Sequence, residues 1–89
     1  MKKTYPVIFT PAKEGGFTSY IPDFEINSQG DDLADTIEMA RDAISLIGID
    51  MLEDGESLPE PSENVQHEDG QTVSFVEVDF AQYRRLWGR

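Results

Sequence analysis

His67 is the only histidine in this 89-residue chain and the first candidate for chemistry. Its polar neighbours, among them Glu68 and Asp69, can raise the basicity of an imidazole. A general base also needs a nucleophile or a bound substrate within hydrogen-bond reach, and the polar sequence around His67 supplies neither. We therefore predict that His67 lies in a solvated loop and has no catalytic role.

Neither cysteine nor serine offers a catalytic nucleophile in this sequence. The absence of cysteine excludes a disulfide framework, an iron–sulfur cluster, a thiolate zinc site and a cysteine nucleophile. No serine lies in a G-x-S-x-G motif; the six are Ser19, Ser28, Ser45, Ser57, Ser62 and Ser74. Gly15 and Gly16 are typical of a turn, because no helix and lysine follow as in a phosphate-binding loop. The sequence thus predicts no catalytic residue, no metal and no cofactor.

The charge of the chain is strongly negative. Eighteen Asp and Glu stand against seven Lys and Arg, for a formal net charge of −11, and residues 42–79 contain eleven acids but no Lys or Arg. Affinity for DNA or RNA depends on cationic side chains that neutralise phosphates, so direct nucleic-acid binding is not expected. The same charge would steer a basic protein toward the chain. The alternative is that the acids only keep the protein soluble.

Three strands are predicted near the N-terminus. Residues 5–10 and 17–21 alternate with period two, which predicts a hairpin with its turn at Lys13–Gly16. Pro22 ends the second strand. Residues 25–29 have the length for a short third strand before a glycine.

From residue 31 the apolar period changes to that of an α-helix. Asp31 or Asp32 is expected to cap its N-terminus and Gly55 to end it after about six turns. The apolar residues share one stripe, which we expect to form the core; they are Leu33, Ile37, Ala40, Ile44, Ile47 and Met51.

The last third of the chain predicts a loop, a strand and a short helix. Pro59 and Pro61 cannot continue a helix, so residues 56–71 are expected to form a surface loop. Residues 73–78 are β-branched and aromatic, as in a strand. Asp79 and Gln82 resemble a capping box for a terminal helix that would dock through one face, formed by Phe80, Tyr83 and Trp87.

The expected fold class is α/β of the α+β two-layer type, with element order β-β-β-α-β-α in one domain over residues 1–89. A right-handed crossover through the helix would place the fourth strand beside the first and parallel to it. The result would be a four-stranded mixed sheet of strand order 3-2-1-4. One long helix leaves part of a sheet face and two strand edges uncovered, so we expect a homodimer or a higher homo-oligomer.

No targeting or membrane segment is expected. The apolar stretch after Lys2 and Lys3 is too short for a signal peptide, and no run approaches the ~18 apolar residues of a membrane span. We therefore expect a cytoplasmic protein with no membrane partner.

Four short motifs occur in a characteristic order: Gly16–Asp23, Ser28–Asp31 before the helix, Leu58–Ser62 and Val76–Tyr83. Together they resemble the N-terminal domain of HicB antitoxins, and the resemblance covers nearly the whole chain. It implies a type II antitoxin that binds a small basic HicA-like toxin and occludes its RNA-cleaving surface. HicB proteins often continue into a DNA-binding segment. Because this sequence stops at Arg89, we expect no C-terminal DNA-binding domain.

The resemblance also implies a partial RNase H-like fold, and with it a less favoured alternative. Asp23, Glu25 and Asp31 would then hold the two metal ions of a nuclease. The simpler interpretation is that Asp23 shapes a turn and Asp31 caps the helix. A further alternative is an orphan HicB-like homo-oligomer that has no toxin partner.

The predicted partner-binding surface combines aromatic and acidic side chains. It assumes that the helix crosses the sheet near the edge formed by the second and third strands. Its residues are Tyr20, Asp23, Phe24, Glu25, Asp35, Glu38 and Asp42. The alternative is that Tyr20 and Phe24 pack in the core.

Overall fold

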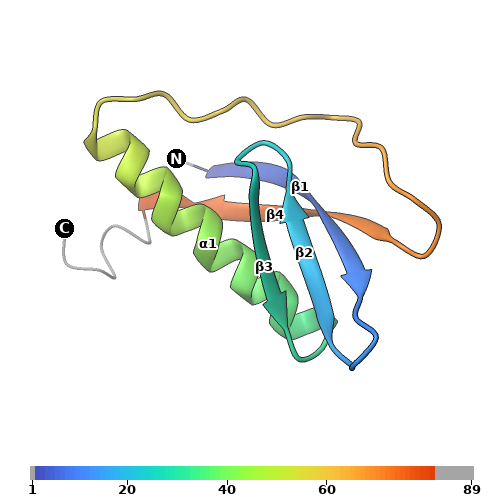
Figure 1. Ribbon diagram of the computed structural model, residues 1–89. Coiled ribbons are helices and arrows are strands. Elements are labelled where there is room, and N and C mark those ends of the chain that lie inside the picture. The colour runs from blue at the N-terminus through green and yellow to red at the C-terminus, as the bar shows by residue number, and fades with distance from the viewer. Residues whose placement is uncertain (1, 82–89) are drawn as a thin grey trace.

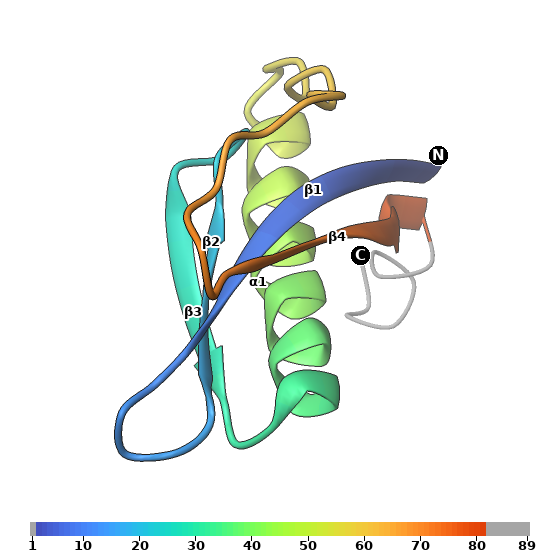
Figure 2. The ribbon, with the colours of Figure 1, turned by 90° about the vertical axis from the view of Figure 1, so that its right-hand side faces the viewer.

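The computed structural model describes residues 2–81 as a four-stranded sheet with one long helix against one face (Figures 1 and 2). The strands are β1 (Lys2–Pro11), β2 (Phe17–Ile21), β3 (Ile26–Gly30) and β4 (Thr72–Asp79), and the helix is α1 (Leu33–Glu53). The sheet order is β3-β2-β1-β4, which confirms the predicted order and the α+β architecture. Tyr83 and Trp87 of the predicted terminal helix lie outside the described residues.

The direction of β4 corrects the prediction of a mixed sheet. Every neighbouring pair of strands is antiparallel, including β1 and β4, which pair from Phe9↔Thr72 to Lys2↔Asp79. A parallel β4 would have to begin at the end of the sheet where α1 finishes. Instead, residues 54–71 run the length of the molecule first, so that β4 returns in the opposite direction (Figure 1). The handedness rule concerns parallel crossovers and does not apply to this connection.

Local interactions form the predicted turn and helix ends. Gly15 and Gly16 have φ angles of 101° and 77°, which suit glycine, and the Ala12 N–H donates to the Gly16 carbonyl at 3.0 Å. At the start of α1, the Asp32 carboxylate accepts a hydrogen bond from the Asp35 N–H at 2.7 Å. The predicted hairpin and N-cap are therefore confirmed.

The core lies between α1 and the facing side of the sheet. The sheet contributes Tyr5, Val7, Phe9, Ile21, Val76 and Val78, and α1 contributes chiefly Ala40 and Ile44. The predicted stripe of α1 is partly wrong, because Leu33 is 38% exposed while the small polar residues Thr36 and Ser45 are buried. Their hydroxyls donate to carbonyls one turn earlier, at 2.6 Å and 2.7 Å, so their burial leaves no unpaired donor.

Two glycines allow close approach to α1. Gly30, at the end of β3, packs directly against Thr36 in the first turns of the helix. Gly48 of α1 lies against the ring of Phe80, which is 2% exposed, so a side chain at either glycine would collide with its neighbour. These contacts fix how α1 is placed, and thereby which of its side chains face solvent.

Candidate functional site

Residues 54–71, which we name the strap, are held to the domain by side chains distant in sequence. The Asp23 carboxylate accepts hydrogen bonds from the Ser62 N–H at 2.9 Å and from the Ser62 hydroxyl at 2.5 Å. The Tyr5 hydroxyl donates to the Pro59 carbonyl at 2.9 Å, and Leu58 is buried in the core. The predicted surface loop is therefore present, but it is anchored at several points.

The phenol of Tyr5 resists ionisation in this setting. Burial, followed by the negative charges of Asp23 and Glu60, raises the pKa of Tyr5 to about 12. Because the folded state then holds this proton more tightly than the unfolded state, Tyr5 contributes stability that is complete below pH 10. That contribution is lost as the pH rises from about 10 to 12.

The structure gives two of the predicted surface residues structural contacts. Asp23 is half-buried and anchors the strap through Ser62. Phe24 is half-buried, and its ring meets that of Tyr5 edge to face, with centroids 4.8 Å apart at an interplanar angle of 72°. The adjacent Glu25 is exposed in the β2–β3 turn, with a φ of 55°.

Tyr20 is exposed on the sheet face turned away from α1. It lies between Ser19 and Ile21, both buried, and neighbouring residues of a strand point to opposite faces. Phe75 of β4 lies on the same outer face as Tyr20 by the same alternation, next to the buried Val76. Tyr20 and the acids of α1 therefore do not form one continuous surface.

The solvent-facing side of α1 carries alternating acidic and apolar residues. Helical spacing aligns five exposed residues along it: Asp35, Met39, Asp42, Leu46 and Asp50. Met39 is 43% exposed and Leu46 is 51% exposed, and helical spacing places both on the same side of α1. Sequence spacing alone did not single out Met39 and Leu46, because they lie off the predicted core stripe. Apolar residues on the helix side opposite that stripe were the signal that could have found them.

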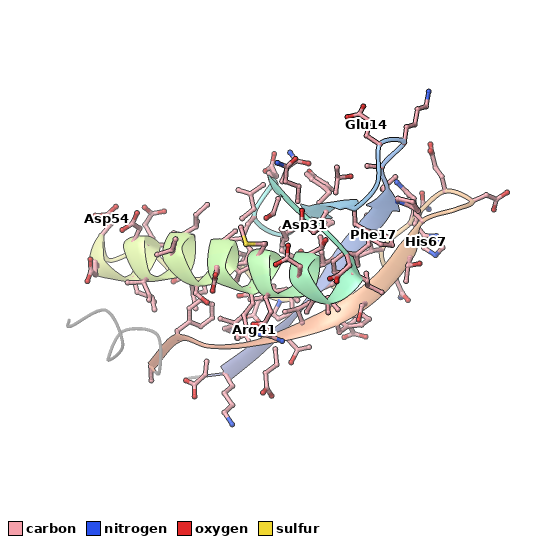
Figure 3. The ribbon with its side chains drawn as sticks, turned by 90° about the horizontal axis from the view of Figure 1, so that it is seen from below. Glu14, Phe17, Asp31, Arg41, Asp54 and His67 are labelled. Carbon is pink, nitrogen blue, oxygen red and sulfur yellow. The ribbon has the colours of Figure 1, made fainter. Side chains whose placement is uncertain are left out.

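Glu38 and Arg41 lie on the flank of α1 that faces β4. The Arg41 Nε donates to the Glu77 carbonyl at 3.0 Å, and its guanidinium also pairs with the Glu38 carboxylate. Figure 3 shows Arg41 between α1 and β4. Of the predicted helix acids, Asp35 and Asp42 thus share the solvent side, and Glu38 lies beside it.

Within residues 2–81, no three His, Asp or Glu side chains are arranged to hold a metal ion. Asp23, Glu25 and Asp31 therefore do not form the carboxylate cluster that the nuclease alternative requires.

A cavity of about 380 Å³ opens beside the start of α1, near Glu14, Asp31 and Asp35. His67 is exposed on the strap, at the opposite end of the molecule from Asp54 (Figure 3).

Within residues 2–81, no helix is both long enough and apolar enough to cross a membrane.

The exposed apolar side chains and acids on the solvent-facing side of α1 make it the candidate surface for contact with another protein. Comparison with known proteins identifies the family. Residues 5–89 match the HicB_like antitoxin of bacterial toxin–antitoxin systems, and the chain belongs to this family.

Two curated relatives are the HicB antitoxins of Escherichia coli K12 and of Escherichia coli O157:H7. Each is 37% identical over 75 residues, which cover 83% of this chain and 51% of the relative. The chain therefore spans about half the length of these relatives.

Solved structures share the fold. A toxin–antitoxin complex from Streptococcus pneumoniae matches with a TM-score of 0.80 at 23% identity, covering 93% of this chain and 73% of that one. A complex of HicA3 and HicB3 matches with a TM-score of 0.67 at 27% identity, covering 86% and 99%. The antitoxin HicB3 matches with a TM-score of 0.73 at 28% identity, covering 91% and 65%.

Proposed function

We propose that this chain is an antitoxin that neutralises a small basic HicA-like toxin by covering the surface with which the toxin binds and cleaves RNA. The observation that carries the proposal is the solvent-facing side of α1, which joins acids to exposed apolar residues. Family membership supports it, as does the similarity to a chain of a solved HicA3 and HicB3 toxin–antitoxin complex. A cytoplasmic location is part of the proposal, because the toxin's mRNA substrate is there.

The proposed mechanism is occlusion without chemistry by the antitoxin. A surface that binds RNA must present cations, and the net charge of −11 on this chain attracts such a surface. The same charge is the reason that we expect no direct nucleic-acid binding by the chain itself. Once docked, apolar contacts exclude water and keep the toxin from its substrate.

The proposal gives different roles to the seven predicted partner-binding residues. Asp35 and Asp42 contact the toxin directly, and Glu38, which pairs with Arg41 beside the solvent side of α1, contacts it at the margin. Phe24 and Asp23 act mainly by holding the core and the strap, in keeping with their contacts to Tyr5 and Ser62. The remaining two, Tyr20 and Glu25, are assigned no toxin contact because they do not share the solvent side of α1.

The proposal predicts a specific result in an RNA cleavage assay. Equimolar chain should abolish mRNA cleavage by its purified toxin, while the chain alone with Mg²⁺ or Mn²⁺ should leave RNA and DNA intact. Cleavage that continues at a tenfold excess of chain would overturn the proposal. Metal-dependent cleavage by the chain itself, lost in Asp31→Asn, would instead support the nuclease alternative.

We further propose that the chain forms a homodimer through the outer sheet face. Tyr20 and Phe75 are exposed on this face and would be buried between two copies, with Glu77 of β4 beside them on the same face. Light scattering at micromolar concentrations should give a dimer for the unmodified chain and a monomer for Phe75→Glu. A monomeric unmodified chain would contradict the proposal. A stable oligomer that binds no toxin would favour the orphan alternative.

A further inference from the structure

The solvent-facing side of α1 has the geometry of a docking strip, which we define as Asp35, Met39, Asp42, Leu46 and Asp50. All five residues are exposed and follow one another at spacings of three or four, so they form a single line along the helix. Met39 and Leu46 are seven residues apart, or about 10 Å along the helix axis. Asp35 precedes Met39 along the strip, Asp42 lies between the two apolar residues, and Asp50 follows Leu46.

Within residues 2–81, the strip contains three carboxylates and no Lys or Arg. Arg41 is the only Lys or Arg in α1, and its guanidinium is directed to Glu38 and the Glu77 carbonyl rather than to the strip. The last turn of α1 has no basic residue. The negative end of the helix dipole therefore adds to the charge of Asp50, and no basic residue of α1 itself offsets it.

These features select one class of occupant. A second copy of the chain would place acids against acids, which disfavours contact between two such strips. Nucleic acid is disfavoured for the same reason. The complementary partner is a basic protein segment that presents two apolar side chains about 10 Å apart, flanked by Lys or Arg.

We infer that a basic amphipathic segment of the toxin lies along this strip, with Met39 and Leu46 as the anchors and the acids as guides. The inference rests on the proposed antitoxin function and names the site and the chemistry of its partner. Buried apolar anchors govern how long a complex lasts, whereas charges at the margin govern how fast it forms. The two groups of residues should therefore have separable effects on binding.

The test measures association and dissociation rates between the full chain and the purified toxin. Met39→Ser with Leu46→Ser should speed dissociation about 30-fold and leave association within about threefold. Leu33→Ser is the control, because Leu33 is also a large exposed apolar residue of α1 but lies outside the strip. The control should change neither rate by more than about twofold. Melting curves verify that each variant is folded.

A second pair of variants tests the acids. Asp42→Asn with Asp50→Asn should slow association about tenfold at low salt and weaken its salt dependence, with little change in dissociation. Glu63→Gln with Glu68→Gln, exposed on the strap, removes the same charge and should have a smaller effect.

The outcomes separate the inference from the proposed function. If the unmodified chain blocks the toxin but the Met39 and Leu46 variant dissociates at the unmodified rate, the docking strip is wrong and the antitoxin function stands. If Leu33→Ser speeds dissociation as much as the strip variant does, the effect is not specific to the strip and the inference is overturned. If the unmodified chain neither binds nor blocks the toxin, the proposed function itself fails.

Discussion

Gly30→Ala is expected to destabilise the protein by about 3 kcal/mol, near the upper end for overpacking a tight contact. A Cβ at this position would lie 2.5 Å from the Thr36 Oγ1, 2.6 Å from its N and 2.7 Å from its Cα. Two of these atoms belong to the backbone of α1, so no side-chain rotation removes the clash. The helix must shift away from β3. Urea unfolding followed by circular dichroism measures the loss.

Gly15→Ala is the matched control for this prediction. No atom lies within 4 Å of a Cβ built on Gly15, and only its φ of 101° opposes a side chain. Backbone strain of this kind costs about 1 to 2 kcal/mol, less than we expect at Gly30. A Gly30→Ala protein as stable as the unmodified chain would show that β3 and α1 are not packed this closely.

Asp23→Ala is expected to cost about 2 to 3 kcal/mol and to release the middle of the strap. The carboxylate accepts two hydrogen bonds from Ser62, and hydrogen bonds to charged groups are worth about 1.5 to 3 kcal/mol. Its removal leaves the half-buried Ser62 N–H without this acceptor. Urea unfolding should show the loss, and limited proteolysis should show faster cleavage within residues 56–71.

Ser62→Ala removes only one of the two hydrogen bonds that the Asp23 carboxylate accepts from Ser62. It removes the hydroxyl donor but keeps the backbone N–H, so it should cost about half as much as Asp23→Ala. Unchanged stability and unchanged proteolysis of Asp23→Ala would contradict the role of Asp23 as the strap anchor. Since Asp23 lies outside the docking strip, folded Asp23→Ala should keep its affinity for the toxin.

The strands, the hairpin turn and the ends of the helix could be predicted because their causes are local. The alternation of residues 17–21 matches β2, and the positive φ of Gly15 and Gly16 follows from the turn they form. The carboxylate of Asp32 caps α1 three residues away, within its own turn. Such interactions join residues close in sequence, so residue type and spacing reveal them.

The direction of β4 and the role of Asp23 could not be predicted, because contacts between distant residues decide them. Asp23 and Ser62 are 39 positions apart, and Tyr5 and Pro59 are 54 apart. Together with the burial of Leu58, these contacts hold the strap on the domain before β4 begins. The sequence of residues 56–71 has no periodicity from which the path of the strap over the domain could be predicted.

The amino-acid sequence by itself determined the order of the four strands and the long helix along the chain, and the negative charge that favours a basic partner. Only the tertiary structure decided which acids share a surface and that Met39 and Leu46 join them. The reason is steric, because the rotation of α1 about its own axis depends on where it can approach its neighbours most closely. Those points are Gly30 against Thr36 and Gly48 against Phe80, and they turn small residues inward and leave two large apolar residues in solvent.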